Sequence, residues 1–295
     1  MSLLLLIAGT VLAPLLPGTI QTLKARMQGR RGPSPLQPYR ELRRLWRKSR
    51  VAPAEASIVY RLAPPLVAAC AACAILVLPT GVDGPLGHDV LVLIGLLALA
   101  RFAITLSSWD TGSGFALMGA ARDLTIAVSV EVLLLLCLVL AALPAGSTDL
   151  NAMTAAASGT AIWFTPAHWC GLAGFVFVAI AETGRQPIDN PDTHLELTMI
   201  HEGPLLEYAG RDLAYLQWAS AARHWIVLAL TATLFLPHPT GPLGAAVTVF
   251  WMGAACLGLA FIETMVAKVR LLRVPVLLGA GSAIALIGLL SRGFG

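Results

Sequence analysis

The stretch SGFALMGAARDLTIAVSVEVLLLLCLVLAAL, residues 113–143, decides the fold class of this chain. An α-helix crosses the hydrocarbon core of a bilayer with about 20 predominantly apolar residues. This stretch is longer than that, and its apolar residues are continuous and do not alternate with polar ones. The pattern therefore predicts a membrane-spanning helix and not a strand of a β-barrel. Because Arg122, Asp123 and Glu131 fall inside it, we expect the helix to be tilted or its first turns to stand in protein.

The composition of the whole chain agrees with a membrane protein. Its 295 residues are 57% apolar and 12% charged. A typical soluble domain is about half apolar and about a quarter charged, so a soluble fold of this size could not cover its surface. The hydrophobicity excludes disorder, and the residue counts exclude a collagen-like or disulfide-stapled scaffold. The net charge of +4 needs no nucleic-acid partner. We expect one integral membrane domain over residues 1–295.

Eight stretches of this kind predict an all-α, polytopic membrane protein with about eight transmembrane helices. Turn-forming Pro and Gly residues separate several of them, as in residues 78–81 and 237–242. The first stretch has no basic residues before it, and its positive charges follow it, so we expect a retained helix and not a cleaved signal peptide. The expected spans are residues 1–22, 60–79, 89–108, 113–143, 158–181, 214–236, 243–265 and 274–291.

The basic residues predict the orientation of these spans. Ten of the 20 Lys and Arg residues lie in the first connection, residues 24–57. With eight spans, every connection that contains basic residues falls on one side, which the positive-inside rule makes cytoplasmic. Both termini then face outward. The other basic connections are residues 182–213 and 266–273, and those without Lys or Arg are residues 80–88, 144–157 and 237–242.

Part of the first connection has the pattern of an amphipathic helix. In residues 36–50, Tyr39, Leu42, Leu45 and Trp46 recur at helical spacing, and Arg and Lys fill the other face. This predicts an interfacial helix lying on anionic lipid. An ordinary positive-inside loop explains the same charges, and the two interpretations are compatible.

The cysteines and histidines do not form a metal-binding pattern. All five cysteines lie in apolar spans, and Cys70-x-x-Cys73 has no second pair or nearby His, as zinc or iron–sulfur ligation usually requires. We expect thiols that pack between helices. His201-Glu202 begins like a zinc-protease motif, but no His stands four residues after His201. A charge network in this region is favoured over a metal cluster.

The second basic connection is also the most acidic part of the chain. Residues 182–213, the acidic loop, contain seven of the 16 carboxylates. A solvated loop can hold such charge, but apolar residues such as Leu195, Met199 and Ile200 are too frequent for a plain exposed loop. We expect a folded, partly buried segment that faces a partner or a cavity.

The motif in this loop resembles a known family. Its first part, Glu182-x-x-Arg185-x-Pro187-x-Asp189-x-Pro191-Asp192, and Glu207-Tyr208-x-Gly210 after it, are similar to the signature loop of respiratory complex I subunit 1. Residues 193–199 with His201-Glu202 more closely resemble one branch of that family, the membrane subunit of formate hydrogenlyase, hydrogenase-4 and related energy-converting group 4 nickel–iron hydrogenases. Residues 119–131 and 263–275 agree with the same family.

Two departures from the quinone-reducing members favour the hydrogenase branch. Gly184 stands where those subunits usually carry Asn before the matched Arg, and Ser129-Val130-Glu131 replaces their Ser-Tyr-Glu. The resemblance then implies a non-catalytic membrane anchor and coupling subunit in the prokaryotic cytoplasmic (inner) membrane. It would link hydrogen and electron chemistry on a peripheral arm to proton or sodium translocation.

The resemblance also implies partners and residue roles. The partners would be the hydrogenase large and small subunits, iron–sulfur subunits and antiporter-like membrane subunits. The nickel–iron centre and the iron–sulfur clusters would lie on them, with no cofactor bound by this chain. The expected peripheral-arm contacts are Lys268, Arg270 and Arg273. The expected coupling and proton-path residues are Arg122, Asp123, Glu131, Glu182, Arg185, Asp189, Asp192, His194, Glu196, His201, Glu202, Glu207, Arg211, Asp212 and Glu263.

The residues themselves give a reason for these roles. Ionisable groups inside membrane helices are expensive and are functional candidates by default. Asp123 and Glu131 are eight residues apart, about 80° around an ideal helix, so we expect them to face one cavity. His194 and His201 would relay protons near neutral pH or simply bond the loop backbone. Static ion pairs between helices are the structural alternative.

Two other functions compete with the hydrogenase interpretation. One is a quinone-reductase subunit of complex I, with a quinone channel between the spans and the acidic loop. The other is a stand-alone ion or solute transporter, which should show an internal repeat with broken helices in matching positions. No such repeat is evident, and the acidic loop occurs once.

Overall fold

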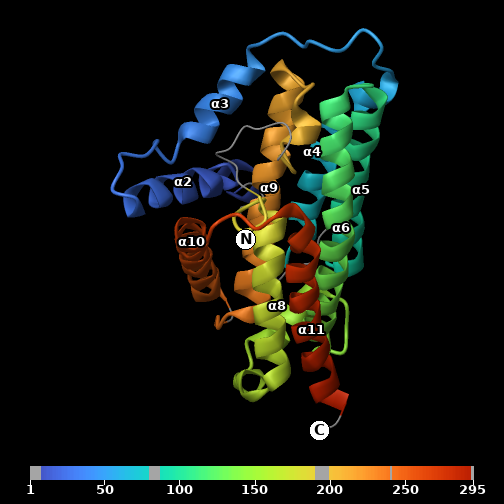
Figure 1. Ribbon diagram of the computed structural model, residues 1–295. Coiled ribbons are helices and arrows are strands. Elements are labelled where there is room, and N and C mark those ends of the chain that lie inside the picture. Colours follow the sequence, from blue (N-terminus) through green and yellow to red (C-terminus); the bar gives the residue numbers. More distant parts are fainter. Residues whose placement is uncertain (1–7, 80–86, 190–198, 240, 294–295) are drawn as a thin grey trace.

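The computed structural model describes residues 8–79, 87–189, 199–239 and 241–293, and in these residues it is helical without β-strands. Six long helices run side by side along the molecule, α10 stands beside them, α2 lies crosswise at mid-height and α3 lies at one end (Figure 1). The long bundle helices are α4 (Ile58–Val77), α5 (Val90–Asp110), α6 (Gly114–Ala142), α8 (Pro166–Glu182), α9 (Gly210–Phe235) and α11 (Val274–Gly293). The others are α2 (Leu15–Met27), α3 (Gln37–Trp46), α7 (Leu150–Ala157), α10 (Pro242–Met265) and the short 3₁₀ helices η1 (Thr160–Phe164), η2 (Gly203–Leu205) and η3 (Leu271–Arg273).

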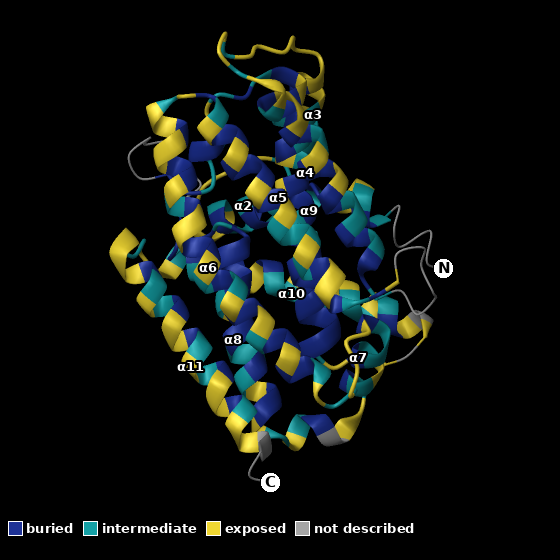
Figure 2. Cartoon of the chain, turned by 90° about the vertical axis from the view of Figure 1, so that its right-hand side faces the viewer, coloured by how far each residue is buried: buried dark blue, intermediate teal, exposed yellow. Residues whose placement is uncertain are grey.

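Most of the expected spans are helices of suitable length and composition. In the described residues, five helices are long and apolar enough to cross a membrane, namely α4, α5, α6, α10 and α11. α8 is apolar but has 17 residues, and α9 has 26 residues but carries several charged ones. Large apolar side chains such as Val132 of α6 and Ile287 of α11 are exposed. Exposed residues recur along both helices (Figure 2). Such faces need lipid or another subunit to cover them.

The first expected span takes a different course. We expected one helix over residues 1–22, but the described part has a helical turn at residues 8–12, a break at Ala13-Pro14, and α2 from Leu15 to Met27. Pro14 has no backbone N–H and its ring blocks a continuous helix at this point. α2 has 13 residues, about 20 Å, which is too short to cross the hydrocarbon core. It packs crosswise against α10 and α9 instead (Figure 1).

Two connections without basic residues lie side by side, in agreement with their expected placement on the same face of the membrane. Asp89 and Asp149 form an isolated antiparallel bridge. The Val90 N–H donates to the Thr148 carbonyl at 3.0 Å, and the Leu150 N–H donates to the His88 carbonyl at 2.7 Å. Both aspartates also cap the helices that follow them, so their carboxylates have structural roles.

Two sequence expectations about packing are confirmed. The described parts of the acidic loop are largely buried, with Ile188, Ile200 and Tyr208 almost inaccessible. All five cysteines are free; Cys70, Cys137 and Cys256 are buried, as expected for thiols that pack between helices, whereas Cys73 and Cys170 are half-buried.

Candidate functional site

A buried arginine that the sequence motifs do not single out lies at the centre of the charged residues. Arg101, in the middle of α5, is 6% exposed. Its Nη2 lies 2.7 Å from Oε1 of Glu182, its Nη1 3.4 Å from Oε1 of Glu131, and its Nε 4.0 Å from Oδ2 of Asp123. Arg223 of α9 approaches the other oxygen of Glu182 at 3.7 Å. Three carboxylates from α6 and α8 therefore converge on cations from α5 and α9.

The acidic loop extends this set of ion pairs. His201 lies 3.8 Å from Asp123 through Nε2 and 3.3 Å from Asp189 through Nδ1. Asp189 also accepts from the backbone N–H groups of Ile200 and His201 and pairs with Lys268 at 3.0 Å. The resulting group is called the Arg101 cluster, and it comprises Arg101, Asp123, Glu131, Glu182, Asp189, His201, Arg223 and Lys268.

His201 and Asp189, the two cluster residues that lie beyond the end of α8, have shifted pKa values. Burial disfavours the charged form of His201, but the hydrogen bond from its ring to Asp189 and the charges of Asp123 and Asp189 outweigh it and raise the pKa of His201. Burial alone would raise the pKa of Asp189, but its bonds from His201 and Lys268 hold that pKa below the usual value. The pair therefore favours protonated His201 beside ionised Asp189.

A second buried group joins α2, α10 and the start of the loop. Nζ of Lys24 lies 2.8 Å from Oε1 of Glu263, and Nη1 of Arg185 lies 3.2 Å from Oε2 of the same carboxylate. All three side chains are less than a tenth exposed. We call this the Lys24 cluster. Lys24 was expected among the basic residues of connection 24–57, but α2 carries it inward as the partner of Glu263.

The backbone of the loop brings the two clusters together. The turn after α8 is closed by the Asp189 N–H donating to the Arg185 carbonyl, so one residue of each cluster stands in a single turn. The Val269 N–H donates to the Pro187 carbonyl and holds the extended segment before η3 against this turn. Further along, Gly203 touches Gly119 of α6 so closely that a Cβ on either would collide with backbone atoms. The loop is thus fixed to α6, α8 and the α10–α11 connection.

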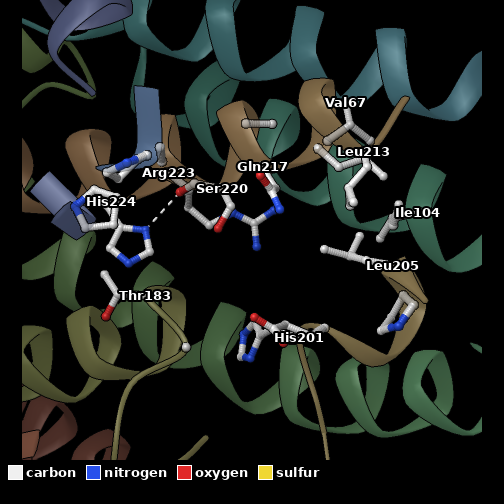
Figure 3. Close-up of a pocket in the computed structure, with 18 of the residues that line it drawn as sticks. Val67, Ile104, Thr183, His201, Leu205, Leu213, Gln217, Ser220, Arg223 and His224 are labelled. Atoms are coloured by element: carbon white, nitrogen blue, oxygen red, sulfur yellow. Dashed lines mark hydrogen bonds between the residues drawn. The ribbon is translucent and has the colours of Figure 1, made fainter. Parts of the chain in front are cut away.

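A cavity of about 640 Å³ lies against the Arg101 cluster. It extends from residues of α2 and α3, such as Pro17 and Leu42, to Arg101, Glu182 and His201. Figure 3 shows His201 of the loop across the cavity from Arg223 and His224 of α9. The ring Nδ1 of His224 donates to the Ser220 carbonyl at 2.9 Å, and its buried Nε2 has no hydrogen-bond partner among the described residues.

The structure brings together about half of the residues expected in the proton path. Asp123, Glu131, Glu182, Asp189 and His201 lie in the Arg101 cluster, and Arg185 and Glu263 in the Lys24 cluster. Asp123 and Glu131 were expected to face one cavity. Both pair with Arg101, but of the two Asp123 alone lines the cavity.

Other expected residues lie elsewhere. Arg122 is half-buried on α6, where its buried Nη1 has no hydrogen-bond partner among the described residues, and Glu202 lines the cavity. Arg211 and Asp212 lie apart from both clusters, at the start of α9 beside Trp46 and Arg50, and Glu207 gives its backbone carbonyl to the Tyr60 hydroxyl. Arg270 and Arg273 are exposed, whereas Lys268 points inward to Asp189. Asp192, His194 and Glu196 lie outside the described residues.

Four residues were missed: the buried Lys24, Arg101 and His224, and the half-buried Arg223. Arg101 is the lone cation in the expected span 89–108, and Arg223 and His224 fall inside 214–236. The rule that marked Glu131, namely that ionisable groups inside spans are functional candidates, applies to them equally. Lys24 offered no such signal, because it looks like one more basic residue after an apolar run.

The fold and these clusters define a class: a polytopic helical membrane protein whose buried ion pairs connect an acidic loop to the membrane helices. The NADH dehydrogenase family matches residues 1–287, and the chain belongs to this family. This confirms the resemblance inferred from the loop motif. The chain is a membrane protein of the prokaryotic inner membrane.

Relatives from hydrogenase complexes are more similar to the chain than those from complex I. Hydrogenase-4 component C of Escherichia coli (strain K12) is 37% identical, over 77% of this chain and 72% of that protein. Formate hydrogenlyase subunit 4 of the same strain is 32% identical, over 95% of this chain and 94% of that protein. A membrane subunit of the NADH-quinone oxidoreductase of Rhodopseudomonas palustris (strain BisB5) is 30% identical, over 76% of this chain and 73% of that protein.

A solved structure supports the fold. A chain of the membrane-bound sulfane sulfur reductase, an archaeal respiratory membrane complex, superposes with a TM-score of 0.84 over 98% of both chains. Its sequence is 21% identical, so this likeness concerns the fold alone.

Proposed function

We propose that the chain is the membrane anchor and coupling subunit of an energy-converting hydrogenase complex of the formate hydrogenlyase type. It would link hydrogen and electron chemistry on the peripheral subunits to proton or sodium translocation in the membrane. The similarity to hydrogenase-4 component C and formate hydrogenlyase subunit 4 supports the type of complex. The basic connections, which the positive-inside rule assigns to the cytoplasmic side, support a cytoplasmic peripheral arm and an outward C-terminus.

The observation that carries the coupling role is the continuity of the charged groups. From Lys268 through Asp189, His201 and Asp123 to Arg101, each step is an ion pair of 4.0 Å or less. Arg101 then reaches Glu131, whose side chain is 39% exposed on α6. A change in charge at the loop therefore alters the field at a carboxylate in the long membrane helix.

The charge balance of the Arg101 cluster links that field to a proton. Among the described residues, the cluster has three permanent cations, Arg101, Arg223 and Lys268. It has four carboxylates, Asp123, Glu131, Glu182 and Asp189. With neutral His201 the cluster has one negative charge too many, and protonation of His201 balances it. Uptake or release of one proton by His201 is thus coupled to which carboxylates the three cations pair with.

The partners follow from the same proposal. Hydrogenase large and small subunits and iron–sulfur subunits would carry the nickel–iron centre and the clusters, and antiporter-like subunits would move the ions. Among the described residues, no three or more His, Cys, Asp or Glu side chains are arranged to hold a metal. Arg270 and Arg273, both exposed, are the proposed contacts with the peripheral arm.

The test is Glu131→Gln, with Glu55→Gln as a matched control. Both changes remove one carboxylate, but Glu55 is exposed and lies outside both clusters. We expect Glu131→Gln to assemble normally and to impair ion translocation coupled to hydrogen turnover in membrane vesicles, while Glu55→Gln behaves as wild type. Normal coupled translocation in Glu131→Gln vesicles would refute the role of Glu131.

The cavity supports a second candidate, a membrane subunit of an NADH/quinone oxidoreductase that forms part of a quinone site. The cavity volume of about 640 Å³ lies in the range of small-molecule sites, and the cavity extends from the α2–α3 side to His201. Bound quinone in the purified complex would favour this candidate. Nickel in a co-purifying subunit, without quinone, would favour the hydrogenase.

A further inference from the structure

A second hollow, separate from the coupling clusters, lies where the end of α3 meets the start of α9. Its volume is about 540 Å³, and it is lined by Trp46, Arg47, Lys48, Ser49, Arg50, Arg211 and Tyr215. Four of these seven residues are cationic and none is acidic. Figure 1 shows the end of α3 beside the end of α9 at which the hollow lies.

Most of this positive charge is uncompensated. Arg50 pairs with Asp212 at 2.8 Å, and Nε of Arg211 donates to the Trp46 carbonyl, which carries no net charge. Among the described residues, no carboxylate lies within ion-pair distance of Arg47, Lys48 or Arg211. Three positive charges therefore face one hollow, and an anion bound there would relieve their mutual repulsion.

The walls of the hollow are held in place by contacts between α3 and α9. The rings of Trp46 and Tyr215 meet edge to face with centroids 5.2 Å apart. Gly210 has φ +60° and lies so close to the Ser49 carbonyl that a Cβ would overlap it. The cations thus stand on a fixed junction and not on a freely moving loop.

The level of the hollow and its apolar rim indicate what it binds. Arg211 comes three residues before the expected span 214–236, so we expect the hollow to lie at the headgroup level of the bilayer. Trp46 is 49% exposed and Val51, next to Arg50, is 62% exposed. Tryptophan is typical of membrane interfaces, and basic pockets beside membrane helices suit lipid phosphates. A soluble anion has no apolar part that would pack against this rim.

We propose that this hollow binds the headgroup of an anionic phospholipid, with its phosphates against Arg47, Lys48 and Arg211 and an acyl chain along Trp46 and Val51. With three uncompensated cations, a lipid with two phosphates binds more tightly than a lipid with one. The proposal is independent of the coupling role, because none of these residues belongs to either cluster.

The test measures cardiolipin retained by the full chain, with whatever subunits co-purify, in phosphatidylcholine nanodiscs that contain a small fraction of cardiolipin. The test variant is Arg47→Gln with Lys48→Gln. The matched control is Arg26→Gln with Arg31→Gln, exposed cations of the same connection that do not line the hollow. At about 1 kcal/mol per basic residue near a membrane surface, the test variant should bind cardiolipin about 30-fold more weakly, and the control as wild type.

A charge-preserving exchange, Arg47→Lys with Lys48→Arg, should keep the lipid and exclude misfolding as the cause of its loss. Equal loss in the test and control variants would show a general surface attraction and overturn the proposal, as would full retention in the test variant. Displacement of cardiolipin by millimolar inorganic phosphate would overturn it in favour of a soluble phosphate site. Loss of a co-purifying subunit with unchanged lipid would overturn it in favour of a protein interface.

Discussion

Replacing Arg101 with glutamine tests the centre of the proposed network. The side chain is 6% exposed and its nearest partner, Glu182, is almost fully buried. Removing one partner of a buried ion pair costs about 3–5 kcal/mol, because the other charge stays buried without its counterion. We expect the lower end, about 3 kcal/mol, since Arg223 remains 3.7 Å from Glu182. At about 2 °C per kcal/mol for a chain of this size, Tm should fall by about 6 °C.

The double variant Arg101→Gln with Glu182→Gln separates the ion pair from the packing around it. In the double variant neither Arg101 nor Glu182 is present to leave the other charge buried without its partner. The double variant should therefore be no less stable than the less stable of the two single variants. Buried and free Cys70, Cys137 and Cys256 allow unfolding in detergent to be followed with a thiol-reactive dye. Glu55→Gln serves as the exposed control. A double variant whose Tm loss equals the sum of the two single losses would refute an interaction between the two residues.

Three further changes test the loop and its surroundings. Since Asp189 and Asp123 raise the pKa of His201, its ion pair stabilises the fold fully below the ordinary pKa, about 6.5, and this is lost as pH rises through the raised value. Tm of wild type should therefore fall between pH 6 and 9 more steeply than Tm of His201→Gln; equal slopes would contradict this. Asp189→Asn should preserve subunit recovery on purification but reduce hydrogen turnover, and unchanged turnover would count against the loop's role. Gly210→Ala should lower Tm by several degrees because its Cβ meets the Ser49 carbonyl at positive φ, whereas Gly95→Ala, which meets no neighbour, should have little effect.

The sequence predicted the structure best where a physical constraint directly determines the residue pattern. The predicted span 60–79 is α4, Ile58–Val77, because helix length and hydropathy are set by the bilayer. The loop motif identified the family, and together with residues 119–131 it named five residues of the Arg101 cluster. Arg101 was within reach of the same reasoning, since one cation in an apolar span must find a carboxylate or water.

The pairing of Lys24 was beyond such reasoning. Its partner Glu263 is 239 positions away, and the contact depends on α2 turning crosswise after Pro14. An apolar run followed by basic residues is equally typical of a straight first span with its charges outside. Composition and periodicity determine which residues face lipid or protein, but they do not determine which helix stands beside which. A buried ion pair between distant helices is therefore found only from the packing.

Because Lys268 points inward, a partner that docks on the neighbouring residues would act on the Arg101 cluster through the backbone of this segment. Lys268, Arg270 and Arg273 were expected to contact the peripheral arm together, but Lys268 pairs with Asp189. Arg270, two residues on, is exposed, and Val269 between them donates its N–H to the Pro187 carbonyl of the loop. A subunit bound to Arg270 would thus pull on a backbone that is hydrogen-bonded to the loop and carries a cation of the Arg101 cluster. A displacement of this short segment changes the distance between Lys268 and Asp189. It thereby changes how far Lys268 neutralises the Asp189 carboxylate that faces His201.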